Sequence, residues 1–370
     1  MKILKNITVF TMVMLLSVST VLEAREKNIS NFSSSASNLV DSTGTFDGNK
    51  IYADVANNGL FLDYHVSGDS ALEWPKGTGV HSIFQSALWM GATVNGSIRT
   101  IVGDYTQDMG PGPWGGDPLA AVHRIYKVEK SMLASPLDFA DFQEWPVEFG
   151  APWVDVDGDG VYTPLPGGTD HPEFLGDQVL WFVSNDGDPA YKLNFGTSPM
   201  NVEIQTTMFG FDRPDVFGDM VFLKQLVINK GSDDLVDTYM GLWSDPDLGY
   251  AGDDFVGCDV ALGMGYVWND GDDSQYSTLD IGTPAAGYDF FQGPMVPCED
   301  GDSEEVCPTE GAKMFGTRHP GMKNLKMSSF AFYINGDATY TDPSDETEGY
   351  FYLQGLRKDG SAYPTEIAGD

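Results

Sequence analysis

Short stretches in which apolar and polar residues alternate recur along most of this chain, and they predict β-strands rather than long helices. Each stretch is bounded by Gly, Pro, Asn or Asp, which favour turns. Many short strands joined by turns are typical of an all-β sandwich or jelly roll. The expected strands are 51–55, 82–93, 178–183, 202–211, 220–229, 238–243, 328–334 and 349–356.

One helix is expected, over 130–142, and Pro136 interrupts it. A proline- and tryptophan-containing belt at 144–153 separates a front β-rich part, 46–145, from a second part, 146–370. We interpret the second part as a β-sandwich with long loops rich in Asp, Gly and Pro. The belt is either a domain boundary or a crossover within one sandwich.

The N-terminus has the residue order of a secretory signal peptide over residues 1–24. Lys2 and Lys5 precede an uncharged run at 7–22, which is too short and too rich in Ser and Thr for a membrane anchor. We therefore expect export to the extracellular space or the outer cell surface, with no membrane insertion of the mature chain. Cleavage after Ala24 and cleavage before Thr20 both remain open.

The segment that follows, 25–45, is rich in Ser and Asn and is expected to be a flexible leader.

The chain is strongly acidic, because 20 Lys and Arg residues stand against 55 Asp and Glu residues, which gives a net charge of -35. Such a chain is repelled by nucleic acids and by anionic membranes, which excludes both as partners. The acids are mostly Asp, which prefers turns and cation-binding loops to helices.

Three cysteines are present, and two of them bracket an acidic loop at 299–305. In an oxidising compartment Cys298 and Cys307 are expected to form a disulfide, which is worth roughly 2 to 3 kcal/mol for so short a loop. Cys258 would then be free. The alternative is three buried thiols.

The sharpest local motif is the run of alternating aspartates at Asp155, Asp157 and Asp159, followed by Gly160 and Val161. Carboxylates at positions one, three and five, a glycine at six and a backbone carbonyl at seven supply several oxygens to one Ca²⁺ ion. The run therefore predicts a calcium site that includes the Val161 carbonyl. The alternative is an acidic turn without metal.

This calcium loop is not an EF-hand, because position twelve is Pro166 and prolines also stand where flanking helices would begin and end. The remaining ligands must come from outside the run. Asp170, Glu173 and Asp177 are the nearest candidates.

A weaker acidic cluster follows the expected strand at 238–243. Asp245, Asp247, Asp254 and Asp259 offer hard oxygen ligands that suit a second calcium ion. A solvated loop that uses Asp for turn geometry explains the same residues equally well.

No motif for a zinc helix, a nucleophile elbow or a phosphate-binding loop occurs in the sequence, and the histidines are scattered singly. We therefore expect no catalytic site. A carboxylate-based glycoside hydrolase remains an alternative, because only geometry reveals its acid pair. A glycan-binding module is another, with Trp114 in a Gly- and Pro-rich loop as the candidate stacking residue, although a buried tryptophan is the commoner case.

Several short strings, which together span most of 48–356, look familiar as a set. They are PKGTG (75–79), SIF (82–84), LWMG (88–91), APWV (151–154), GDQVLW (176–181), WSDPDLG (243–249), DDFVGCD (253–259) and GYDFFQGP (287–294). In these strings the chain resembles a family of large bacterial surface proteins exported by type IX secretion. The resemblance implies secretion followed by display on, or release from, the outer surface, and it carries over no catalytic residue. Such proteins typically end in a β-sandwich sorting domain, which these residues lack, so we expect either a longer protein or another export route.

The sequence thus predicts a secreted or cell-surface β-sandwich stabilised by calcium, with a structural, adhesive or interaction role. Its expected partners are Ca²⁺ and a surface glycan or protein.

Overall fold

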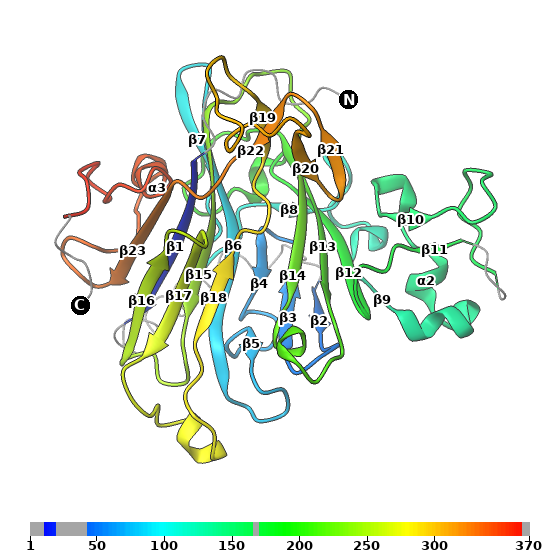
Figure 1. Cartoon of the computed structure of the whole chain (residues 1–370), viewed down its shortest axis with the longest axis horizontal. Helices are drawn as coiled ribbons and strands as arrows, with labels where there is room; N and C mark the ends of the chain where they lie inside the picture. The colour runs from blue at the N-terminus through cyan, green and yellow to red at the C-terminus, as the bar shows by residue number, and fades with distance from the viewer. Residues whose placement is uncertain (1–10, 20–42, 166–169, 365–370) are drawn as a thin grey trace. The chain divides into compact units, whose positions relative to one another are not determined.

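The computed structural model describes residues 11–19, 43–165 and 170–364 and confirms the all-β class (Figure 1). Most strands pair in antiparallel sheets, and the described residues contain only short 3-10 turns and two short α-helices. The chain divides into two compact units. The first comprises 43–87 and 103–232 of the described residues, and the second comprises 11–19, 88–102 and 233–364. Strand β6 (His81–Val94) supplies residues to both.

The first unit contains two sheets of antiparallel strands. In one, the order is β2-β3-β5-β6, with β4 also pairing with β6; in the other, β14-β13-β12 is extended by β8 and β9, which both pair with β12. The belt at 144–153 lies inside this unit and does not separate the two. The strands are β2 (Thr43–Phe46), β3 (Tyr52–Ala56), β4 (Leu60–Leu62), β5 (Leu72–Glu73), β8 (Gly110–Pro111), β9 (Tyr126–Glu129), β12 (Gln178–Asn185), β13 (Val202–Gly210) and β14 (Phe222–Asn229), with a separate ribbon of β10 (Trp153–Val154) and β11 (His171–Pro172).

The predicted helix over 130–142 is present only as broken turns. The 3-10 helices η2 (Lys130–Ala134) and η3 (Pro136–Asp138) precede the single turn of α2 (Ala140–Gln143). Pro136 opens η3, as expected for a residue that lacks the N–H needed to continue a helix. The other short turns of the unit are η1 (Ala121–His123), η4 (Val147–Phe149), η5 (Pro189–Tyr191) and η6 (Val216–Asp219).

The core of the first unit forms around β12, which is buried along its whole length. Val179, Trp181 and Val183 alternate along the strand and therefore share one face, where they pack with Trp145 and Phe142. A strand covered on both faces needs an almost continuous apolar sequence, and 179–183 has one. β9 pairs with β12, and the ribbon of β10 and β11 lies between these two strands in the sequence.

A buried ion pair connects two loops of the first unit. Lys192 Nζ lies 2.8 Å from Asp108 Oδ2 and 4.0 Å from Asp186 Oδ2, and all three side chains are almost completely buried. Asp186 also accepts hydrogen bonds from the backbone N–H groups of Met200 and Val202, both at 2.7 Å. Burial raises the pKa of Asp186, and the charge of Lys192 opposes that effect.

The second unit combines a mixed sheet, a three-stranded sheet and two ribbons. The C-terminal end of β6 pairs with β7. The sheet that contains β2, β3, β5 and β6 continues in the order β6-β15-β1-β23, and it is mixed because it includes parallel as well as antiparallel pairs. The strands are β1 (Thr11–Ser19), β7 (Ser97–Ile101), β15 (Val236–Pro246), β16 (Asp254–Asp259), β17 (Met264–Asn269), β18 (Ala286–Asp289), β19 (Met295–Pro297), β20 (Ala312–Met314), β21 (Thr317–His319), β22 (Met322–Asn324) and β23 (Ser329–Asn335), with η7 (Tyr276–Leu279) and α3 (Glu346–Leu353).

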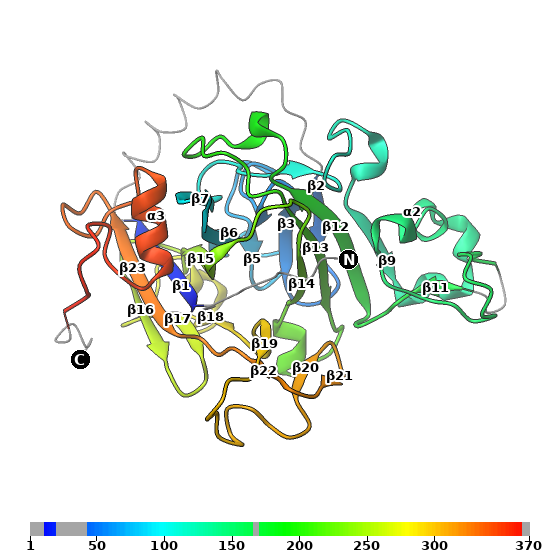
Figure 2. The ribbon, with the colours of Figure 1, turned by 90° about the horizontal axis from the view of Figure 1, so that it is seen from above.

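Part of the predicted signal peptide is a strand in this structure. β1 lies between β15 and β23 and runs parallel to both, as Figure 1 and Figure 2 show. The rest of 1–24, and the leader up to residue 42, lie outside the described residues. The export prediction therefore stays a prediction, and cleavage at either predicted site would remove β1.

The expected strand at 349–356 is wrong, because most of it belongs to the helix α3. Asp345 caps the helix by accepting hydrogen bonds from the N–H groups of Thr347 and Glu348. The Tyr350 ring then lies against Gly91 of β6, where a Cβ atom would come within 2.7 Å of it. No helix in the described residues is long and apolar enough to cross a membrane.

The predicted disulfide is present. Cys298 and Cys307 are bonded, with their Cα atoms 5.8 Å apart, and they close the acidic loop that follows β19. Cys258 in β16 is free and half-buried, as expected.

Removing the positive charge from the buried ion pair should destabilise the first unit. We expect Lys192→Met to lower the free energy of unfolding by about 3 to 5 kcal/mol, because it leaves carboxylates buried without their cation. The half-exposed pair of Lys50 and Asp219 is the control, and Lys50→Met should cost at most about 1 kcal/mol. Urea unfolding measures both, and equal losses would show that the buried pair has no special role.

Candidate calcium site

The ribbon of β10 and β11 fixes the two ends of the aspartate loop. Val154 pairs with His171 and Trp153 with Pro172, so Asp155 and Asp170 stand side by side where the ribbon opens. The 3-10 turns and loops around Trp145 anchor the ribbon, since the Trp145 Nε1–H donates to the Pro152 carbonyl at 3.0 Å. A pairing of residues so far apart in sequence explains how Asp170 joins the run at 155–159.

Backbone N–H groups of the loop bind its carboxylates. Asp155 accepts from the N–H groups of Gly158 (2.7 Å) and Gly160 (2.9 Å), and Asp159 accepts from Val161 (2.7 Å). Gly158 and Gly160 have φ angles of +77° and +75°, a conformation that residues with a side chain rarely adopt. The glycines therefore let the loop fold back over Asp155.

Asp170 is the buried member of the group, with 1% of its surface exposed. It accepts hydrogen bonds from the N–H groups of Val156 (2.9 Å) and Thr163 (2.7 Å), one on each carboxylate oxygen. These bonds orient the carboxylate from beneath the loop, while Asp155, Asp157 and Asp159 are exposed.

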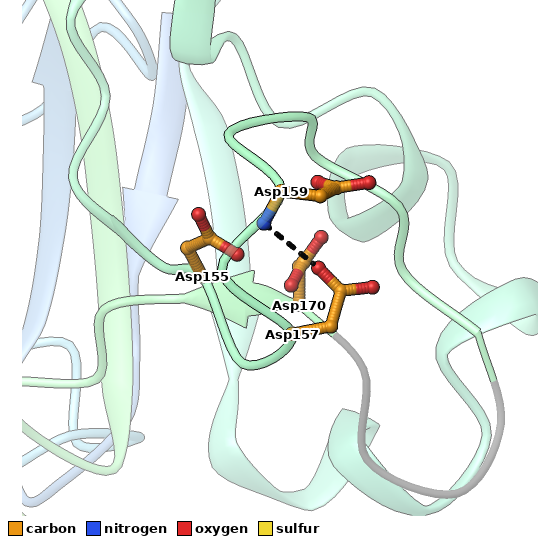
Figure 3. A group of neighbouring side chains, drawn as sticks. All are labelled: Asp155, Asp157, Asp159 and Asp170. Carbon is orange, nitrogen blue, oxygen red and sulfur yellow. Dashed lines mark hydrogen bonds between the residues drawn. The ribbon is translucent and has the colours of Figure 1, made fainter.

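The four aspartates each offer an oxygen, and these oxygens lie within 4.8 Å of one another (Figure 3). Two oxygens bound to one Ca²⁺ ion at about 2.4 Å are at most about 4.8 Å apart, so the group fits such an ion. The described residues hold no second group of three or more His, Cys, Asp or Glu side chains that meets this distance.

Mutual repulsion acts on Asp157. A hydrogen bond from the Asp159 N–H, at 3.2 Å, lowers the pKa of Asp157, but partial desolvation and the charges of Asp159, Asp170 and Asp155 outweigh it. The net pKa is raised. A cation among these carboxylates would reverse the effect by favouring their ionised form.

The other predicted ligands of this site, Val161, Glu173 and Asp177, have contacts of their own. The Val161 carbonyl accepts a hydrogen bond from the Thr163 hydroxyl at 3.4 Å. Asp177 lies outside the group and accepts the N–H of Asp212, and Glu173 is 3.8 Å from Lys224 Nζ. Asp170 is therefore the ligand candidate that the geometry favours.

The second acidic cluster does not converge in the same way. Asp245, Asp247 and Asp254 are buried near the end of β15 and the start of β16, but Asp259 lies at the other end of β16. Six strand residues separate the two ends by roughly 17 Å. Asp259 is therefore too far from Asp254 to bind the same ion, and the four residues do not form one site.

Asp273 is the residue in this region that sequence reasoning missed. It is fully buried and accepts backbone N–H groups of Tyr250 (2.8 Å), Gln275 (2.7 Å) and Tyr276 (2.8 Å). Gly249 makes room for it, because a Cβ atom there would lie 2.2 Å from Asp273 Oδ1. In the sequence, Asp273 looks like one more acid in a solvated run.

The alternative glycan-binding residue is accessible. Trp114 is 43% exposed, its Nε1–H donates to Asn201 Oδ1 at 3.1 Å, and its backbone N–H donates to Glu203. Its exposure meets one requirement of a sugar-stacking residue, and the glycan hypothesis stays a prediction.

The raised pKa of Asp254 predicts a pH-dependent stability. Burial is the largest cause and raises the pKa of Asp254, the Leu248 N–H lowers it, and the charges of Asp247 and Asp253 raise it; the net pKa is about 7. Between about pH 4 and 7 the folded protein therefore keeps a proton that the unfolded chain releases, and stability falls as the pH rises through this window.

We expect Asp254→Asn to stabilise the protein relative to wild type at pH 8 and to lose that advantage at pH 4. Thermal unfolding across this range measures the difference, with Asp300→Asn as the control, because Asp300 is an exposed aspartate of the same unit that does not act on the pKa of Asp254. An advantage that does not change with pH would contradict the assignment.

Comparison of the chain with protein-family models, curated proteins and solved structures gave no match.

Proposed function

We propose that this protein is a secreted or cell-surface β-protein that binds calcium at Asp155, Asp157, Asp159 and Asp170 and has a structural, adhesive or interaction role. The observation that carries the proposal is the convergence of four carboxylate oxygens within 4.8 Å on a loop built by backbone hydrogen bonds. Carboxylate oxygens are the ligands that Ca²⁺ prefers, and this set offers no nitrogen or sulfur donor.

Calcium at this site would act mainly on stability. An ion that binds only the folded state stabilises it by mass action. Three of the four carboxylates are exposed, and backbone N–H groups are the donors that the loop supplies to them, so a bound cation would add the positive charge that offsets their repulsion. We therefore infer a structural ion rather than a catalytic one.

Two features support export. Lys2 and Lys5 precede the uncharged run of the predicted signal peptide, and the disulfide between Cys298 and Cys307 is of the kind that persists in oxidising compartments. The resemblance to proteins of type IX secretion supports surface display as part of this proposal. The acidic composition favours solubility outside the cell.

Calcium should raise the melting temperature of the purified protein. At about 100 times Kd the ion adds about 2.7 kcal/mol, which is roughly 5 to 10 °C for a unit of this size. Asp157→Asn should abolish most of this gain, because it removes a ligand charge and keeps the acceptor for the Asp159 N–H.

The matched control is Asp188→Asn, since Asp188 is also an exposed aspartate of the first unit and accepts the N–H of Ala190. It should keep the full calcium response. A melting temperature that does not change between calcium and chelator would refute the calcium site and leave the export proposal untouched.

Export should require the apolar run. When the full chain is expressed in a bacterium with two membranes, we expect a product outside the cytoplasm whose N-terminus is Thr20 or Arg25, as mass spectrometry would show. Leu15→Arg should leave full-length chain in the cytoplasm, because a charge in the apolar run disrupts the signal. Asn31→Arg, in the leader, should be exported normally; cytoplasmic wild-type protein with an intact N-terminus would count against export.

A further inference from the structure

The sheet of β16, β17 and β18 has one face turned to solvent. Along each strand the side chains alternate, so Asp254 and Val267 are buried on one face while Phe255 and Trp268 lie on the other. Phe255 pairs directly with Trp268; it is 49% exposed, and the two ring centroids are 5.8 Å apart. We call this solvent-facing side the outer face of the β16–β17–β18 sheet.

Tyr266 forms the next row of the outer face, and glycines flank it. Gly257 of β16 and Gly287 of β18 are its partners on either side, so neither neighbouring strand places a side chain next to the ring. A Cβ atom at Gly257 would lie 3.0 Å from both Tyr266 and Trp268. The Tyr266 and Trp268 rings, 5.4 Å apart, therefore lie over bare backbone and present a stacking surface.

Acidic residues form the third row. Met264 pairs with Asp259 on one side and Asp289 on the other, about 7 Å along the strands from the Tyr266 row. None of the ion pairs in the described parts of the chain involves Asp259 or Asp289. The whole stretch from 231 to 312, which contains this sheet, has no Lys, Arg or His.

We propose that the outer face binds the guanidinium group of an arginine-bearing segment of a partner protein. The rings offer a negative π-face to a cation, and the carboxylates of Asp259 and Asp289 accept its N–H donors. Arginine suits the site better than lysine because its planar group both stacks on aromatic rings and bridges carboxylates. The surrounding acidic stretch attracts a basic partner during encounter.

A neutral sugar would also stack on such rings, but it would gain nothing from the charge of the acidic stretch. This inference rests on the interaction role proposed above and names the chemistry of the partner, an arginine-bearing segment. It involves only the second unit, so it is tested with chelator present, and its failure is thereby separated from failure of the calcium site.

The test is calorimetric titration of the full chain with a hexa-arginine peptide at low and physiological salt. We expect binding that Tyr266→Leu weakens about fivefold, because leucine keeps apolar volume and removes the π-face. Asp259→Asn combined with Asp289→Asn should weaken it by at least as much and should flatten its salt dependence. Melting curves of the variants confirm that they fold.

The controls change a ring and an acid elsewhere in the second unit, both of which are more exposed than the Tyr266 ring and the Asp259 and Asp289 side chains. Phe315→Ala and Asp300→Asn should bind hexa-arginine as wild type does. Equal loss in control and outer-face variants would show unspecific attraction to an acidic protein and overturn the proposal.

Two other results would also overturn it. Hexa-lysine binding as tightly as hexa-arginine would contradict guanidinium recognition. Binding of cellohexaose that depends on Tyr266, without binding of hexa-arginine, would identify the outer face as a sugar platform instead.

Discussion

Hydrogen bonds from backbone N–H groups to aspartate carboxylates hold the loops of this protein in place, and most of its irregular structure depends on them. The chain carries 55 acidic residues and only 20 lysines and arginines, so most carboxylates have no cation to pair with. Asp155, Asp170, Asp186 and Asp273 each accept two or more N–H groups. A hydrogen bond to a charged group is worth roughly 1.5 to 3 kcal/mol, which offsets part of the cost of desolvating the carboxylate.

Hydrogen bonds from backbone N–H groups to aspartate carboxylates have different consequences according to how deeply the carboxylate is buried and which charges lie near it. Asp186 is buried near Lys192, whose charge opposes the rise in the pKa of Asp186 that burial causes. Asp254 has no such partner among the ion pairs of the described chain, and burial raises its pKa to about 7. At the ribbon of β10 and β11, backbone donors orient four carboxylates but leave their repulsion, which is the reason for placing a cation there.

Local sequence was sufficient to predict the features that short-range chemistry determines. The alternating strands, the break at Pro136, the disulfide of Cys298 and Cys307 and the aspartate run were all visible, because each depends on residues close together in the chain. The helix α3 was missed because its aromatic residues imitate a strand, although Asp345 and the glutamates that follow are a helix start signal.

Long-range pairing set the limits of prediction. Only the ladder between β10 and β11 selects Asp170 over Asp177, and only the length of β16 separates Asp259 from Asp254. Asp273 and Gly249 are 24 residues apart and meet through the fold of their loops, so no spacing rule reveals them. The outer face of the β16–β17–β18 sheet likewise exists only once three strands are in register.

The central claim, that the four aspartates form one cation site, has a direct spectroscopic test. Trp153 in β10 and Tyr162 lie together at the base of the loop, with ring centroids 5.6 Å apart, and aromatic rings near a bound Tb³⁺ ion transfer excitation to it. Terbium luminescence should therefore appear on titration, should disappear on addition of excess Ca²⁺, and should be absent in Asp157→Asn. Luminescence that Ca²⁺ does not displace, or that persists unchanged in Asp157→Asn, would contradict a calcium site at this loop.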